Sequence, residues 1–226
     1  MLEGKIVMMQ LPIFSFLISQ ERRIYFDDIY PLTKIIPGED EVNKYEALYL
    51  NRLLITQAPA IALGNAKKEL VHLASYAIQS LEASYAFFDK GDEKYFDKVE
   101  KYETAVNSID EELTTYLIEI SNELLSVYEN EILASVLDSV RDLERIGDLA
   151  VASANLSQHI HNKGIEFSGT AKAELEDVYN RTHRIDLDSI RVVVDDDKVL
   201  AGQVILRHEE LKKLEKQLRM ISYQTS

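Results

Sequence analysis

The sequence lacks cysteine and tryptophan throughout its 226 residues, which excludes disulfides, thiolate metal ligands and cysteine nucleophiles. Proline and glycine are also scarce, at 4 and 8 residues. A chain with so few helix-breaking residues, and rich in Leu, Ala, Glu and Lys, is typical of long helices. Basic residues number 25 against 39 acidic ones, a net charge of −14. Because nucleic-acid phosphates require clustered Lys and Arg, we expect no nucleic-acid partner.

The first 57 residues differ in character from the rest of the chain. Residues 6–18 are largely apolar, but Gln10 and Pro12 interrupt the run, and it is too short to span a bilayer core of about 30 Å. The run fits either the tail of a membrane helix or a docking segment. Pro31, Pro37 and Gly38 then break any helix. We expect residues 1–57 to be an apolar segment and a linker with little core of its own.

From Pro59 onward, apolar residues recur every three or four positions, which is the period of an amphipathic helix. The pattern predicts a helix from residue 59 to a turn at 89–92, and a second helix from there to a break at 122–126. Three more are predicted at about 129–161, 170–193 and 199–220. Short links between long amphipathic helices favour antiparallel neighbours, so the sequence predicts an all-α, up-down helical bundle.

An internal repeat is visible at an offset of 105 residues, which places Val99 on Val204 and Val106 on Leu211. The repeat unit is a three-helix bundle, with a first copy at residues 58–168. We expect the second copy, residues 169–226, to lack its last helix, either because the chain is cut at its C-terminus or because the repeat has eroded. We therefore expect the last two helices to expose an apolar groove that promotes self-association as a homo-oligomer or binding of a partner. Its predicted lining is Leu200, Val204, Leu211 and Leu214.

Acidic residues with helical spacing point to a cation site. Glu144 and Asp148 are four residues apart and share one helix face, with Gly147 between them. A mid-helix glycine costs roughly 1 kcal/mol relative to alanine, so it indicates close packing or a ligand. On the preceding helix, one flank carries Glu103, Asn107 and Asp110. If the two flanks face each other, five oxygen-bearing side chains converge on a hard or borderline cation; if they face water, they are ordinary helix surface.

Two blocks of sequence resemble a known family. Residues 143–150 read LERIGDLA and resemble the signature of the PhoU family, placed as there in the third helix of a three-helix repeat. Residues 49–63, followed by 66–70, resemble the entry to the PhoU-like domain of bacterial sodium/phosphate cotransporters. In those proteins a segment like residues 35–40 joins the last membrane helix to the domain. The resemblance extends over about residues 31–222.

The resemblance implies a bundle of two three-helix repeats and a regulatory role in phosphate uptake without catalysis. It implies a cytoplasmic location, at the inner face of the plasma membrane where the domain is fused to or docked on a transporter. It also implies acidic pairs that bind clustered metal ions in some members. Carried over by position, Glu144, Asp148 and Glu103 match these pairs, whereas Asn107 replaces an aspartate.

In the last helix the equivalent positions are His208 and Lys212, and a lysine ammonium repels a cation. One cation site therefore remains, for iron, zinc or magnesium. Its predicted ligands are Glu103, Asn107, Asp110, Glu144 and Asp148.

An enzyme reading rests on Glu69 and His72, which form the E-x-x-H element of di-iron carboxylate bundles. Such sites require a second copy of the element and two further glutamates, and no second copy is present. We interpret the pair as a histidine beside a core stripe. Because no nucleophile elbow or phosphate-cradling glycine loop occurs either, we predict a non-enzyme.

Three functions are carried forward. The first is a regulatory domain of a sodium/phosphate cotransporter. The second is a free-standing PhoU-type regulator that contacts the ABC-type phosphate importer and its sensor kinase. The third is a ferritin-like metal oxidase.

Overall fold

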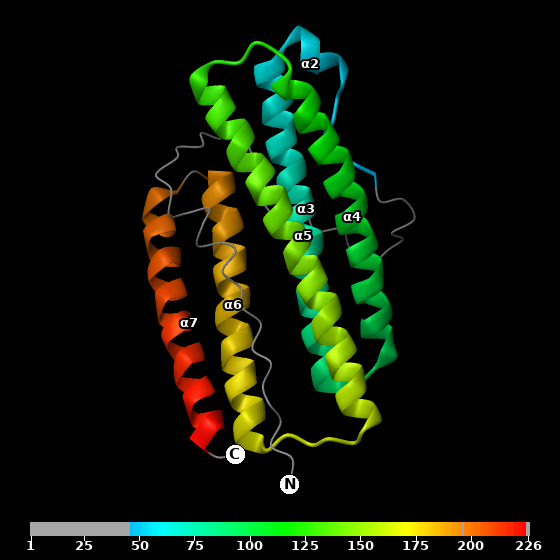
Figure 1. Ribbon diagram of the computed structural model, residues 1–226, viewed down its shortest axis with the longest axis vertical. Helices are drawn as coiled ribbons and strands as arrows, with labels where there is room; N and C mark the ends of the chain where they lie inside the picture. The colour runs from blue at the N-terminus through cyan, green and yellow to red at the C-terminus, as the bar shows by residue number, and fades with distance from the viewer. Residues whose placement is uncertain (1–45, 196, 225–226) are drawn as a thin grey trace. The chain divides into compact units, whose positions relative to one another are not determined.

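The computed structural model describes residues 46–195 and 197–224, and every regular element in this part is a helix (Figure 1). The predicted all-α class is thus confirmed. The chain divides into two compact units between residues 158 and 159, ten residues before the predicted repeat boundary. The apolar run at residues 6–18 lies outside the described residues. No described helix is long and apolar enough to cross a membrane.

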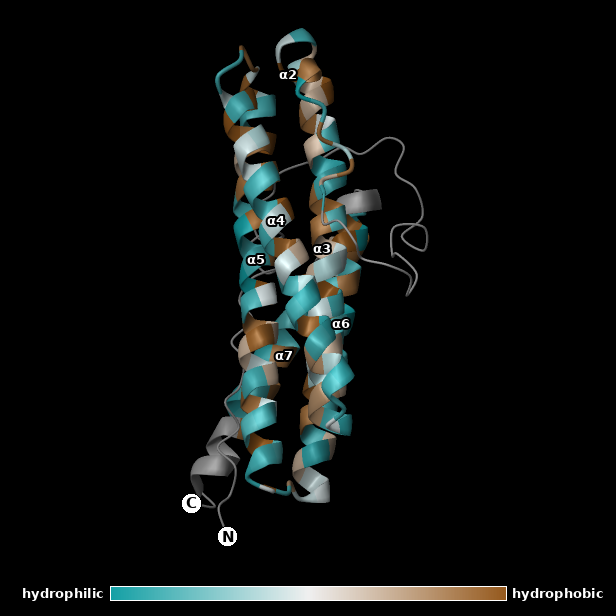
Figure 2. Cartoon of the chain, turned by 90° about the vertical axis from the view of Figure 1, so that its right-hand side faces the viewer, coloured by the Kyte–Doolittle hydropathy of each residue, from teal (hydrophilic) through white to brown (hydrophobic). Residues whose placement is uncertain are grey.

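Three long helices make up the larger unit: α3 (Pro59–Lys90), α4 (Glu93–Ser121) and α5 (Val127–Asn162). They lie side by side with short links, as predicted for an up-down arrangement (Figure 1). Figure 2 shows hydrophobic and hydrophilic residues alternating along each helix, as the amphipathic period requires. The predicted stripe of α5 is buried throughout and consists of Leu133, Val136, Val140, Leu143, Gly147, Ala150 and Ala154.

Local chemistry explains where these helices begin and end. Pro59 occupies the first position of α3, where its missing N–H has no partner to lose. Gly91 closes α3 with a positive φ of 66°, and the Asp92 side chain then caps α4 by accepting the Lys94 N–H at 3.1 Å. At the start of α5, Ser126 and Glu129 form a reciprocal capping box, with distances of 2.7 and 3.2 Å.

The expected linker contains a short helix. Residues Leu53–Gln57 form α2, and Ile55 within it is 4% exposed. The Tyr116 hydroxyl on α4 donates to the Asn51 carbonyl at 3.1 Å, and Arg52 pairs with Glu119 at 2.9 Å. The described end of residues 1–57 is therefore packed on the bundle, and periodicity missed it because five residues are too few to show a helical stripe.

The smaller unit contains α6 (Gly169–Asp195) and α7 (Lys198–Gln224). Asp197 caps α7 by accepting the N–H groups of Val199 and Leu200, each at 2.9 Å. Asp92 and Asp197, and likewise the first residues of α4 and α7, are separated by the same 105 residues that the sequence repeat predicted. Asp188 joins the two helices through an ion pair with Arg207.

The prediction that Val204 lines an exposed apolar groove on α6 and α7 is wrong. Val204 is only 1% exposed, because it lies on the buried side of α7. Leu200, Leu211 and Leu214 are half-buried. The exposed large apolar side chains of α7 in the described residues are Val199, Ile205 and Leu206.

Candidate functional site

The predicted acidic flank lies beside a tight contact between α4 and α5. A Cβ added at Gly147 would lie 3.3 Å from Val106 Cγ1, which is tighter than most side-chain contacts in proteins. Val106 is fully buried. The glycine therefore serves close helix packing, one of the two roles that its mid-helix position indicated, and this packing places the acidic residues on either side of the contact near one another.

Three of the five predicted ligands lie near one another beside this contact, Asp110 on α4 and both Glu144 and Asp148 on α5. Burial raises the pKa of Glu144 above its ordinary value, and the negative charges of Asp148 and Asp110 raise it further. Burial also raises the pKa of half-buried Asp110, although Thr114 and the positive charge of Arg141 oppose the shift. Close carboxylates that repel one another are a setting in which a bound cation or proton lowers the energy.

The other two predicted ligands are engaged with each other. Asn107 Nδ2 donates to Glu103 Oε1 at 2.6 Å, on the exposed side of α4. Within the described residues, no three His, Asp or Glu side chains lie close enough together to hold a metal ion. A cation at this flank therefore requires rotation of at least one carboxylate from its present position.

The equivalent positions of the second repeat have a different electrostatic character. His208 is buried, and burial together with the positive charge of Lys212 lowers its pKa. A neutral imidazole beside an ammonium group does not attract a cation, in contrast to the carboxylates of the acidic flank.

A second polar centre lies at Glu69, whose side chain is fully buried in α3. Its Oε2 accepts the backbone N–H of Leu48 at 2.8 Å and of Tyr49 at 2.7 Å. Its Oε1 lies 2.8 Å from Nδ1 of His72, which is also buried. The E-x-x-H spacing predicted a histidine beside the core and did not indicate the anchoring of residues 48 and 49. The available signal was a charged residue adjoining the apolar stripe at Ala66 and Leu70.

The comparison with known families bears on this three-helix unit. Residues 70–156 match the PhoU domain family. The PhoU resemblance drawn from residues 143–150 is thereby confirmed over this part of the chain. The PhoU match spans α3 to α5 and includes all five predicted ligands, whereas residues 49–63 and the second repeat lie outside it. No curated protein and no solved structure matches the chain.

Proposed function

We propose that this chain is a non-catalytic regulatory domain in phosphate transport, acting in the cytoplasm on a sodium/phosphate cotransporter. The observation that carries the proposal is the PhoU match over the three-helix unit, because it ties this unit to a family associated with phosphate uptake. The transporter branch is favoured by the entry block at residues 49–63, which resembles the segment leading into such domains.

Residues at the start of the entry block are attached to the bundle, which supports this proposal. Glu69 binds the backbone of Leu48 and Tyr49, and Tyr116 binds the carbonyl of Asn51. Residues 48, 49 and 51, near the start of the described chain, are therefore held on the bundle at fixed points. A domain that regulates a membrane transporter requires such an attachment, since a loose tether would transmit little change in conformation.

The third function, a metal oxidase, is disfavoured by the use made of Glu69. Both carboxyl oxygens of Glu69 have internal partners, namely two backbone N–H groups and His72. A carboxylate occupied in this way anchors the chain and is not available to bridge a di-iron centre. The E-x-x-H element of this chain is thus accounted for by structure.

A single cation site at the α4–α5 flank is part of the proposal. Glu144 and Asp148 supply adjacent carboxylates, and Asp110 supplies a third charge from the neighbouring helix. Glu103 and Asn107 join only if their mutual hydrogen bond opens. Iron, zinc and magnesium all suit oxygen ligands of this kind, and the neutral Asn107 lowers the affinity expected for any of them.

Phosphate uptake separates the two regulatory functions. Deleting the gene for this chain and restoring it on a plasmid should change sodium-dependent uptake of radiolabelled phosphate in phosphate-replete cells. If the chain is instead a free-standing regulator, deletion should leave sodium-dependent uptake unchanged and should raise ATP-driven uptake together with phosphatase expression. No change in either uptake route would contradict both.

A further inference from the structure

Exposed apolar side chains gather at one end of the three-helix unit. Among the described residues 46–158, nine large apolar side chains are exposed, and eight of them lie in two segments, 48–61 and 118–128. Leu156 is the exception. Leu124 is completely exposed, and Val127 and Leu53 are 79% and 70% exposed. We call this surface the apolar end; it is defined by Leu48, Leu53, Ile61, Ile118, Leu124 and Val127.

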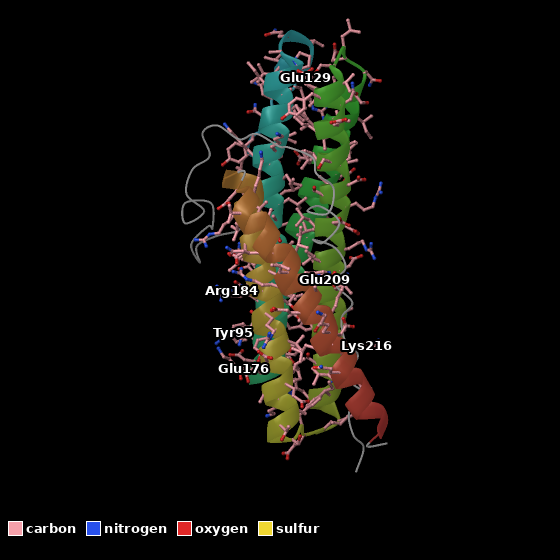
Figure 3. All side chains as sticks on the ribbon, turned by 90° about the vertical axis from the view of Figure 1, so that its left-hand side faces the viewer. Tyr95, Glu129, Glu176, Arg184, Glu209 and Lys216 are labelled. Atoms are coloured by element: carbon pink, nitrogen blue, oxygen red, sulfur yellow. The ribbon has the colours of Figure 1, made fainter. Side chains whose placement is uncertain are left out.

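The two segments lie at the same end of the unit. Figure 1 shows α2 and the link between α4 and α5 together at one end of the three helices, and Figure 3 places Glu129 there. The Arg52–Glu119 ion pair and the bond from Tyr116 to Asn51 join α2 to the end of α4. The Ser126–Glu129 capping box sets the course of the link. The apolar end is therefore built from anchored backbone.

Acidic residues outnumber basic ones in the two segments that form the apolar end. Residues 46–61 and 115–131 contain five acidic residues, Glu46, Glu119, Glu123, Glu129 and Glu131, and one basic residue, Arg52. Arg52 is already paired with Glu119. The surface thus presents apolar side chains within a field of negative charge.

We propose that the apolar end binds a protein segment whose apolar side chains are flanked by Lys and Arg. Burying exposed leucines and valines favours association, and the charge of the surroundings selects the partner. An anionic membrane surface has the wrong sign of charge. A second copy of the same end would bring like charges together, which opposes a symmetric dimer through this surface.

Cytoplasmic loops of membrane proteins carry an excess of Lys and Arg beside apolar helix ends, so they have the chemistry that this surface selects. In that respect the inference deepens the proposed function, and assigning a transporter loop as the partner rests on that function. The binding surface itself does not, because a peptide assay tests it without reference to phosphate.

Two labelled helical peptides of about 18 residues, one of Leu and Lys and one of Leu and Glu, serve as probes for the full chain. Fluorescence anisotropy at about 0.15 M salt should show binding of the Leu–Lys peptide only. The double substitution Leu124→Ser with Val127→Ser should weaken binding roughly tenfold or more. The matched control, Val199→Ser with Leu206→Ser, removes side chains of the same types that are 74% and 66% exposed on α7, and it should leave binding unchanged.

Charge reversal gives a second arm. Glu123→Lys with Glu131→Lys should weaken binding of the Leu–Lys peptide and create binding of the Leu–Glu peptide. Equal binding by wild type and the Leu124/Val127 variant would overturn the proposal. So would sedimentation with phosphatidylcholine–phosphatidylglycerol vesicles, or self-association, that the same variant abolishes, because the occupant would then be lipid or a second copy. Absence of Leu–Lys peptide binding to the wild-type chain would also overturn it.

Discussion

Glu69 Oε1 lies 2.8 Å from His72 Nδ1, and both side chains are buried in α3. The second carboxyl oxygen of Glu69 accepts the backbone N–H groups of Leu48 and Tyr49. The Glu69 side chain therefore links these two residues to His72. Buried polar groups that lose their partners are costly, and this pair is therefore a sensitive point in the fold.

Replacing Glu69 should destabilise the protein. Glu69→Ala leaves the N–H groups of Leu48 and Tyr49 and the His72 ring without their partner, and we expect a loss of about 2–3 kcal/mol. Glu69→Gln keeps one acceptor and should lose about 1 kcal/mol. Urea unfolding measures the loss, and faster hydrogen exchange at Leu48 and Tyr49 locates it. Glu100→Ala, at an exposed site on α4, is the control and should change stability by less than about 0.5 kcal/mol.

Adding a methyl group at position 147 should destabilise the protein, because overpacking against Val106 outweighs the gain in helix propensity. Gly147→Ala gains about 1 kcal/mol of propensity, but its Cβ meets Val106, a buried β-branched side chain that has little room to rotate. With overpacking costs of about 1–3 kcal/mol, we expect a net loss of about 1 kcal/mol in thermal or urea unfolding. Gly64→Ala is the matched control, because a Cβ at residue 64 of α3 meets nothing within 4 Å. That substitution should stabilise the protein, and equal behaviour of the two variants would contradict the close-contact explanation.

Cation binding should depend on the pair Glu144 and Asp148. Titrating Mg²⁺, Zn²⁺ or Fe²⁺ into metal-free protein should raise the melting temperature of the wild type. The double substitution Glu144→Gln with Asp148→Asn should abolish that rise. Elemental analysis after dialysis should give less than one metal per chain for the wild type. If the double variant retains as much metal as the wild type, these acids are only a solvated helix flank.

The same pair predicts a pH effect without metal. The pKa of Glu144 is raised in the folded chain, so the folded state disfavours its charged form. Its contribution to stability is fully present below the unfolded pKa and is lost as the pH rises through the folded value. Asp148→Asn should therefore stabilise metal-free protein at pH 7 more than at pH 4. The gain should stay below about 1 kcal/mol, because Asp148 is exposed and solvent screens its interaction with half-buried Glu144.

Asp186 on α6 should also make the folded protein less stable as the pH rises, and its effect should be larger than that of Glu144. Burial raises its pKa from 3.8 to about 7, and His183 opposes the shift. Its Oδ2 has no hydrogen-bond partner among the described residues. Stability is lost as the pH rises from about 4 through 7, with a cost of roughly 2–3 kcal/mol between pH 5 and pH 8. Asp186→Asn should remove most of this slope in urea unfolding. Asp177→Asn, at an exposed ion pair with Arg181, should retain the slope.

The long helices could be predicted from sequence because each presents an apolar stripe over many turns. The stripe from Leu133 to Ala154 is buried as expected, and the turn at Gly91 and Asp92 ends one helix and caps the next. Such features depend on residues near one another in the chain, where period and capping chemistry act directly.

Features that depend on tertiary position were not predictable in the same way. Nothing in the E-x-x-H spacing shows that Glu69 faces the backbone of residues 48 and 49, about twenty positions earlier. Likewise the helical wheel placed Glu103, Asn107 and Asp110 on one flank, but only the packing at Gly147 determines that Asp110 lies near Glu144 while Glu103 pairs with Asn107. Val204 was expected in a groove because a stripe shows which face is apolar and not whether that face is covered.

The bonds from Glu69 to Leu48 and Tyr49 are made to backbone atoms, and this has a consequence for how the protein can diverge. Any residue other than proline supplies the N–H that the carboxyl group accepts. Relatives that keep the anchor are therefore expected to hold an acidic residue at position 69 while positions 48 and 49 drift. In an alignment, this attachment would be visible as one invariant acidic residue and two variable positions at which only proline is absent.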